Sequence, residues 1–325
     1  MIKGYRSAII ILIVIVILGV EVAINMMSQK KEEQAITIGF AGDVMIGRLV
    51  NEIIDQTGYQ YPWGNMLPYL HKTDLNIINL ETTLTHSTKK VPKVFNFKAS
   101  PDRVQILKEA NIDIVDLANN HSLDFEVEGL HETIAVLDAA GITHVGAGAT
   151  IAAAKKPVII EKKGIRIGII GCTDNEPEWK ATENKPGTNY VNINDAQSVD
   201  ELCKNIKELR PQVDIVVLTI HWGPNMRKHP SAEFVAAAHK LIECGVDIFH
   251  GHSAHILQGI ELYKNALIMY DTGDFVDYYM VTPSKRNDHS ALFLVTIDKN
   301  GIQGVTRLHG LKTVASHLNN RIYFY

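Results

Sequence analysis

The sequence predicts a layered α/β domain with mixed sheets, because strand-length apolar runs alternate with helical patterns over most of its 325 residues. A second observation is that the end of the chain changes to consecutive strands joined by short turns. A third is that no break in composition divides the chain, so residues 35–325 are expected to form one domain.

The composition predicts a large core and argues against two broad classes of protein. The chain is 46% hydrophobic and 21% charged, which is typical of a packed domain rather than a disordered one. Its net charge of -4 argues against nucleic acid as a partner, since nucleic-acid-binding domains normally have a basic bias. Cys172, Cys203 and Cys244 match no zinc or disulfide framework in their spacing, and we expect buried, small hydrophobic side chains.

The N-terminal segment predicts attachment to the cell membrane. Lys3 and Arg6 precede an apolar run over residues 8–20, and a weaker apolar stretch continues to residue 27. The run lies between a signal-peptide core of about 7–15 residues and a spanning helix of roughly 20. No small-x-small cleavage site follows it, so we favour an uncleaved, single-pass signal anchor over residues 1–27 to a cleaved signal peptide. Residues 28–34 then form a short stalk, and the domain lies outside the cytoplasm.

The expected elements follow from hydrophobic periodicity. In the first half, three strands at 36–40, 75–79 and 114–118 alternate with helices at 46–56, 101–110 and 126–140. The second half begins with a hairpin around Lys163-Gly164 and continues with helices at 199–209 and 231–244. Its remaining strands are expected at 215–220, 248–249, 259–263, 266–271, 291–297 and 304–309.

Residues able to bind metal recur directly after the expected strands. They are Asp43, Glu81, Asn120, His121, His221, His252 and His255. Ligand sites in α/β sheets lie beyond the carboxyl ends of strands, so we expect these residues to meet at one edge of the fold. Taken singly, each has a simpler interpretation: Asp43 caps a helix, Glu81 and Asn120 belong to turns, and His221 is a core histidine.

The residue types at these positions favour a particular chemistry. Carboxylate, amide oxygen and imidazole together suit divalent Mn, Fe or Zn, and the lack of cysteine argues against a structural zinc site. More than four ligands predict two ions rather than one. Paired ions about 3.5–4 Å apart can activate a water and stabilise the leaving oxygen of a phosphoryl transfer.

Five segments, in a fixed order, carry a resemblance to a known family. They are Ala-Gly-Asp-Val-Met from Ala41, Asn-Leu-Glu from Asn79, Ala-Asn-Asn-His-Ser-Leu-Asp from Ala118, His-Trp-Gly from His221, and Gly-His-Ser-Ala-His-Ile-Leu-Gln-Gly from Gly251. Over residues 36–279 the chain resembles the CapA (PgsA) family, poly-γ-glutamate capsule synthesis proteins within the calcineurin-like metallophosphoesterase superfamily. The resemblance implies a four-layer α/β/β/α sandwich of the metallophosphoesterase type, with two sheets between helices.

The same resemblance implies roles for the candidate residues. Asp43 looks like a ligand of a first metal, for which His255 is a further candidate, and Glu81 stands where a bridging Asp is usual. His121 resembles the histidine that protonates a leaving oxygen. The ligands of a second metal resemble three residues, Asn120, His221 and His252.

Departures from the metallophosphoesterase pattern count against an ordinary phosphatase. Met45 stands where the first motif usually has a histidine, which removes one ligand. Glu81 is one methylene longer than the usual Asp, and the last histidine pair is one residue further apart than usual. Asp274 replaces the asparagine common in the capsule family and adds a carboxylate near the expected site, as a ligand or as a local charge.

Three functions remain open from the sequence. The first is a membrane-anchored, extracytoplasmic metal-binding protein that acts on an acidic polymer in poly-γ-glutamate capsule synthesis or export, with membrane partners of a polyglutamate synthase complex. The second is a self-sufficient phosphoesterase that attacks its substrate with a metal-activated hydroxide and uses His121 as general acid. The third is a metal-stabilised structural domain. We find no nucleophile elbow, phosphate-binding loop or dinucleotide fingerprint.

Overall fold

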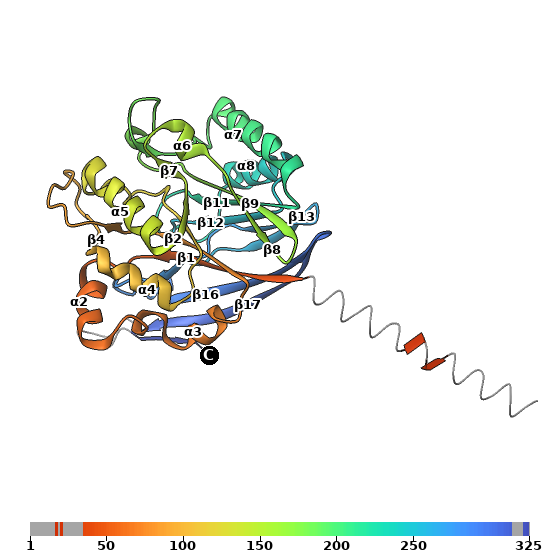
Figure 1. The fold of residues 1–325 in the computed structure, drawn as a ribbon, viewed down its shortest axis with the longest axis horizontal. Helices are drawn as coiled ribbons and strands as arrows, with labels where there is room; N and C mark the ends of the chain where they lie inside the picture. The colour runs from red at the N-terminus through yellow and green to blue at the C-terminus, as the bar shows by residue number, and fades with distance from the viewer. Residues whose placement is uncertain (1–16, 19, 22–34, 314–320, 325) are drawn as a thin grey trace, which may run out of the picture.

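The computed structural model describes residues 17, 18, 20, 21, 35–313 and 321–324, with side chains described up to residue 309. The expected anchor at 1–27 and stalk at 28–34 therefore lie outside the described residues, four positions excepted. Within the part that is described, no helix has the length and apolar character needed to cross a bilayer. The described chain forms a mixed α/β fold built on two large sheets (Figure 1).

The first sheet has eight strands and combines a parallel half with an antiparallel half. Its order is β18-β17-β16-β1-β2-β5-β6, and β15 pairs with the end of β1. The parallel half consists of β1 (Ile36–Val44), β2 (Leu75–Leu80), β5 (Ile114–Asp116) and β6 (Thr143–Val145), with the short β15 (Asp274–Val276). The antiparallel half consists of β16 (His289–Asp298), β17 (Gly301–Thr313) and β18 (Arg321–Phe324).

The second sheet has six strands in the order β13-β14-β12-β11-β9-β8. They are β8 (Val158–Lys162), β9 (Ile165–Thr173), β11 (Ile215–His221), β12 (Ile248–His252), β13 (Ile260–Tyr263) and β14 (Ala266–Met269). Two small sheets pair β3 (Thr83–Leu84) with β4 (Lys98–Ala99), and β7 (Ala147–Gly148) with β10 (Gly187–Thr188).

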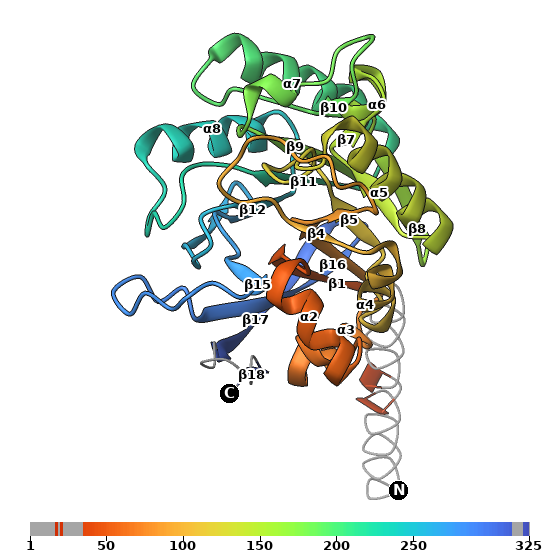
Figure 2. The same cartoon turned by 90° about the vertical axis from the view of Figure 1, so that its left-hand side faces the viewer.

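Helices cover the outer faces of the two sheets (Figures 1 and 2). The first sheet packs against α2 (Arg48–Thr57), α3 (Leu67–Leu70), α4 (Val104–Glu109) and α5 (Glu126–Ala140). The second sheet packs against α7 (Ala196–Leu209) and α8 (Ala232–Glu243). Shorter elements are α6 (Ile151–Lys155) and the 3-10 turns η1 (Tyr61–Met66), η2 (Pro101–Arg103), η3 (Pro177–Trp179) and η4 (Arg210–Gln212).

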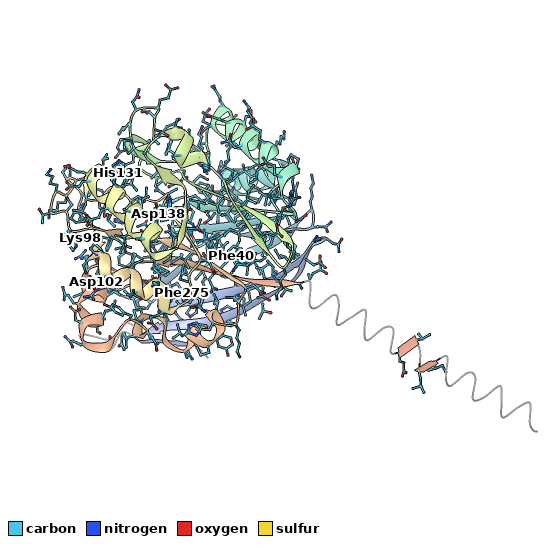
Figure 3. All side chains as sticks on the ribbon, viewed as in Figure 1. Phe40, Lys98, Asp102, His131, Asp138 and Phe275 are labelled. Atoms are coloured by element: carbon cyan, nitrogen blue, oxygen red, sulfur yellow. A yellow bond between two sulfur atoms is a disulfide. The ribbon has the colours of Figure 1, made fainter. Side chains whose placement is uncertain are left out.

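A separate apolar core lies between the two sheets. Alternate residues of the strands supply it, among them Ile38 and Phe40 of β1 and Ile167 of β9. Phe40 is fully buried in the interior, whereas Asp102 and Asp138 lie at the outer surface (Figure 3). Burial on both faces explains why the central strands are almost continuous apolar runs.

Most of the expected elements are confirmed, with differences at their ends. The hairpin around Lys163-Gly164 joins β8 to β9, and both turn residues have the positive φ that such a turn requires. The strand expected at 248–249 was too short. It continues to His252, because parallel pairing with β11 continues as far as His221.

The expectation for the cysteines is wrong for two of the three. Cys203 and Cys244 form a disulfide between α7 and the end of α8, with their Cα atoms 5.3 Å apart. The two helices lie side by side on the second sheet, which brings together cysteines 41 residues apart in sequence. Cys172 is a buried free thiol, as expected.

Candidate metal centre

Polar residues at or next to the ends of strands from both sheets meet at one end of the fold. In the first sheet, parallel pairing sets Asp43 of β1 beside Asn79 of β2 and Asp274 of β15. In the second sheet, it sets His221 of β11 beside His252 of β12. All five residues are buried, so the carboxyl ends of the two sheets enclose a polar cluster.

A first group of possible ligand atoms joins Asp43 to two histidines. Oδ1 of Asp43 lies 3.6 Å from Nδ1 of His221 and 3.5 Å from Nδ1 of His252. The two Nδ1 atoms are 3.1 Å apart. The side-chain amide of Asn79 donates to the same Oδ1 at 2.7 Å and so orients the Asp43 carboxylate. Three ligand atoms this close are spaced as around one cation.

A second group lies on the other side of the same carboxylate. Oδ2 of Asp43 is 3.2 Å from Nδ1 of His255, and that nitrogen is 2.7 Å from Oδ1 of Asp274. Asp43 is therefore common to both groups, with one oxygen directed at each. A carboxylate in this position is suited to bridging two cations.

Glu81 and Asn120 offer further oxygens that the described residues do not satisfy. Both carboxylate oxygens of Glu81 and Oδ1 of Asn120 are buried and accept no hydrogen bond within the described chain. Glu81 belongs to neither ligand group, and its Oε1 lies 3.6 Å from Nε2 of His121. Buried oxygens without partners are costly, and a bound divalent ion would satisfy them. The Asp and His groups thus fit a metal centre, while the bridging role of Glu81 and the ligand role of Asn120 stay predictions.

His121 is held with one ring nitrogen toward this cluster. Its Nδ1 is 2.5 Å from the Asp124 carboxylate, which also accepts from the Phe97 amide at 2.7 Å and from Nζ of Lys93 at 3.1 Å. The ring packs edge-on against Phe97, with centroids 4.2 Å apart. Burial lowers the pKa of His121 to about 4, although Asp124 acts in the opposite direction. Nε2 is left to face Glu81.

The electrostatics of the cluster are those of crowded, buried acids. Burial would raise the pKa of Asp43, but hydrogen bonds with His221 and His255 hold it well below its usual value. Burial and the Asp43 charge raise the pKa of Glu81 well above its usual value. Burial lowers the pKa of His255, yet the charges of Asp274 and Glu81 raise it well above normal. Burial lowers the pKa of His221 and of His252, which favours the neutral imidazole that binds metal.

The backbone is strained in the loop after β12, which carries the candidate ligand His255. Ser253 and His255 have φ values of 113° and 58°, a region that costs side-chain-bearing residues about 1–3 kcal/mol each. The Ser253 amide donates to Asp43, which fixes this loop against β1. Gly42 permits the close approach of β15, because a Cβ there would lie 1.8 Å from the carbonyl oxygen of Gly273.

Comparison with known proteins decides the family. Residues 37–279 match the model of a family described as bacterial capsule synthesis protein PGA_cap. The chain belongs to this family. The resemblance inferred from the five sequence segments is thereby confirmed.

Individual relatives of the capsule synthesis family agree with this assignment. The probable polyglutamine synthesis accessory protein Rv0574c of Mycobacterium tuberculosis is 34% identical over 284 residues, covering 75% of each chain. The capsule biosynthesis protein CapA of Bacillus anthracis is 31% identical over 76% of this chain and 61% of its own length. The PGA biosynthesis protein CapA of Bacillus subtilis is 29% identical over 83% of this chain and 70% of its own.

A solved structure shares the fold at low sequence identity. The crystal structure of a hypothetical protein from Thermus thermophilus aligns with a TM-score of 0.50 at 14% identity. The alignment covers 84% of this chain and 98% of that one. It supports the layered α/β architecture of this capsule synthesis family member and nothing about its chemistry.

The sequence analysis missed two polar residues in the centre of this family member and left the role of a third open. Asn79 and Asp116 are the last polar residues of β2 and β5, so the strand-end rule that selected Glu81 applied to them equally. Oδ2 of Asp116 lies 3.6 Å from Nε2 of His252 and accepts no hydrogen bond from the described residues. Asp274, for which the sequence left open whether it is a ligand or only a local charge, lies within the second ligand group.

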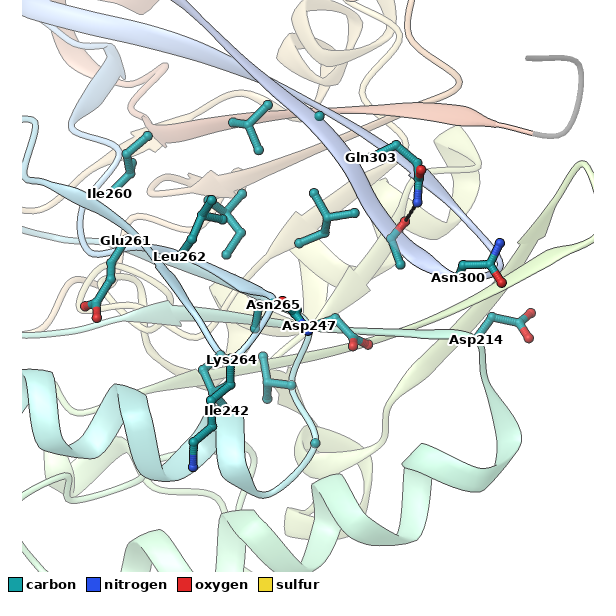
Figure 4. Close-up of a pocket in the computed structure, with 18 of the residues that line it drawn as sticks. Asp214, Ile242, Asp247, Ile260, Glu261, Leu262, Lys264, Asn265, Asn300 and Gln303 are labelled. Atoms are coloured by element: carbon teal, nitrogen blue, oxygen red, sulfur yellow. Dashed lines mark hydrogen bonds between the residues drawn. The ribbon is translucent and has the colours of Figure 1, made fainter. Parts of the chain in front are cut away.

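A cleft elsewhere in the molecule is separate from this centre. It has a volume of about 1350 Å³ and lies at the opposite ends of the strands, between the β13–β14 hairpin and the start of β17 (Figure 4). Its lining includes Ile260 and Leu262, whose side chains are exposed, and Asp247. None of the metal-centre residues contributes to it.

Proposed function

We propose that this member of the capsule synthesis family is a membrane-anchored, extracytoplasmic protein of poly-γ-glutamate synthesis or export. Its divalent-metal centre would act on the polymer. The observation that carries the proposal is the pair of ligand groups sharing Asp43, in a chain whose relatives are named for capsule and polyglutamate synthesis. The finer fold we propose is the four-layer metallophosphoesterase sandwich, in which such a centre lies at the strand ends.

The proposed centre holds two divalent ions, with Mn, Fe and Zn as candidates. The ligands that we propose are Asp43, His221 and His252 on one side, and Asp43, His255 and Asp274 on the other, with Glu81 and Asn120 adding oxygens. Bound there, the ions would polarise a carbonyl or phosphoryl oxygen and activate water. The metal ligands would determine where a substrate oxygen binds. Nε2 of His121 would hold or release a proton beside Glu81.

The proposed location rests on two features of the chain. Lys3 and Arg6 before the apolar run at 8–20 support a single-pass anchor with the domain outside. The Cys203–Cys244 disulfide supports an oxidising compartment, since cytoplasmic proteins seldom keep such bonds. An anchored domain would work beside membrane partners that join and transport the polymer.

The test is metal-dependent binding of the polymer by the full chain purified in detergent. With Mn²⁺ present, we expect saturable binding of poly-γ-glutamate and weaker binding of α-linked polyglutamate. Chelation should abolish the binding, and re-addition of Mn²⁺ should restore it. Equal affinity before and after chelation, or purified protein that takes up no divalent ion, would refute the proposal.

A second candidate is a self-sufficient phosphoesterase, and the arrangement of His121 favours it. Asp124 fixes Nδ1, so Nε2 is directed at the cluster, and in the protonated ring it can give a proton to a leaving oxygen. Turnover of bis(p-nitrophenyl) phosphate with Mn²⁺ is its assay. Turnover that disappears in His121→Ala with unchanged metal content, together with no binding of poly-γ-glutamate, would replace the first candidate by this one.

A further inference from the structure

Arg48 is an arginine close in sequence to the metal-centre residue Asp43. It lies at the start of α2, five residues after Asp43, and it is exposed. Arg103 and Arg210 each pair with a carboxylate, whereas none of the ion pairs within the described chain involves Arg48. Its charge is therefore available to a ligand.

Aromatic rings hold the Arg48 guanidinium in place. Its Cζ lies 5.0 Å from the ring centroid of Tyr278, 5.6 Å from that of Phe95 and 5.8 Å from that of Phe97. Contacts of this kind use the face of the guanidinium and leave N–H groups at its edge free to donate. The rings thus orient the cation without neutralising it.

The backbone at Arg48 is fixed and strained. A Cβ on Gly47 would lie 2.9 Å from the Lys98 carbonyl oxygen, and the Ile46 amide donates to the Thr82 hydroxyl at 3.0 Å. Arg48 itself has a φ of 50°, which is unfavourable for a side-chain-bearing residue. Strain of this kind persists where the surroundings enforce it and is frequent at ligand sites.

The same rings connect Arg48 to the metal centre. Phe97, which contacts the guanidinium, also meets the His121 ring edge-on. Tyr279, next to Tyr278, meets the His255 ring with centroids 5.1 Å apart. Phe97 thus contacts both side chains, so a group bound at Arg48 would lie one aromatic ring away from His121.

We propose that Arg48 binds an anionic group of the substrate next to the group held at the metal centre. The ligand chemistry is a carboxylate or phosphate, because the edge of a guanidinium donates to two oxygens of such a group. This inference rests on the proposed function, in which the ligand is a free α-carboxylate of poly-γ-glutamate. Each γ-linked unit carries one, so adjacent units can occupy the metal centre and Arg48 together.

The test compares Arg48→Met and Arg48→Lys with a matched control, Arg307→Met, in the full chain loaded with Mn²⁺. Arg307 is an exposed arginine on β17, away from the strand ends that form the centre. Binding of poly-γ-glutamate and of inorganic phosphate is measured by calorimetry, with metal content and thermal unfolding followed in parallel.

We expect Arg48→Met to retain metal and melting temperature while its affinity for the polymer falls about 10-fold or more. Arg48→Lys should recover only part of the lost affinity, because lysine keeps the positive charge but lacks the paired N–H donors of the guanidinium. Wild-type affinity in Arg48→Met, or an equal loss in Arg307→Met, overturns the proposal.

The measurement of phosphate binding distinguishes failure of the anion site from failure of the proposed function. If the wild type binds metal and phosphate but no polymer, and phosphate binding depends on Arg48, the anion site stands and the role in polymer synthesis fails. If the wild type binds metal but neither polymer nor phosphate, the anion site at Arg48 is itself refuted.

Discussion

The two ends of the sandwich use acidic residues in opposite ways. At the amino ends of four parallel strands, an aspartate directly precedes the strand; these are Asp74, Asp113, Asp214 and Asp247. Each carboxylate accepts a backbone N–H of the neighbouring strand at 2.7–2.9 Å. At the carboxyl ends, Glu81 and Asp116 keep buried oxygens that no described donor reaches.

The difference shows at which end of the strands the carboxylates are satisfied by protein donors. Each of the four aspartates at the amino ends also donates its own backbone N–H to the carbonyl of the same residue whose N–H its carboxylate accepts, so each pairing with the neighbouring strand is reciprocal. The acids at the carboxyl ends crowd around Asp43 without enough donors. Substitutions at the amino ends should therefore change stability alone, whereas those at the carboxyl ends should change metal content.

The largest effect is expected from Asp43→Asn, because Asp43 belongs to both ligand groups. Removing an outer-shell partner typically weakens metal binding by about 10–100-fold, and loss of a shared ligand should exceed that. Elemental analysis of purified protein should find both ions depleted. Near-normal metal content in Asp43→Asn would show that this carboxylate is not shared.

Metal removal should come next in size. A ligand at 100 times its dissociation constant stabilises a protein by about 2.7 kcal/mol, so chelation should lower the melting temperature reversibly. Calorimetric melting with and without EDTA measures the shift, and Asp43→Asn should show none. An identical wild-type melting curve in EDTA would mean that the buried oxygens are satisfied in another way.

Gly42→Ala should disturb the carboxyl ends through packing rather than charge. The added Cβ would lie 1.8 Å from the Gly273 carbonyl oxygen, so β15 and Asp274 must shift. We expect a loss of about 1–3 kcal/mol in unfolding free energy, accompanied by weaker metal binding. Gly304→Ala on β17 is the matched control, since its Cβ meets nothing within 4 Å. Denaturant unfolding and metal titration compare the two variants.

The smallest effect is expected from Asp247→Asn, the counterpart of Asp43→Asn at the other end. Asp247 accepts from the Val216 amide and pairs with Arg210. Its loss should cost about 1–2 kcal/mol of unfolding free energy and leave metal content unchanged. A drop in metal content here would show that the two ends are coupled and would remove the contrast between them.

The carboxyl-end half of this contrast could be predicted from the sequence, whereas the aspartates at the amino ends were not predicted. Runs rich in Ile, Val and Leu defined the central strands, because strands buried on both faces are apolar throughout. Polar residues after those strands then had to meet at one edge, and Asp43, His221, His252 and His255 do so in the structure. Site residues were therefore predictable where the direction of a parallel strand alone determines which edge of the sheet they reach.

The rest depends on register, which a single sequence does not reveal. The pairing of β1 with β2 shifts between Phe40 and Asp43, and a one-residue shift reverses which face a side chain points to. Asp274 enters through a strand of three residues, too short for a periodic pattern. Cysteine spacing likewise does not give connectivity, so the Cys203–Cys244 bond required the positions of two helices.

Anomalous diffraction at the manganese edge from crystals grown with Mn²⁺ tests the shared carboxylate most directly. We expect two peaks about 3.5–4 Å apart, one beside each oxygen of Asp43. One would lie near His221 and His252, and the other near His255 and Asp274. A map with no peak at Asp43, or with manganese bound only elsewhere on the molecule, would contradict the account.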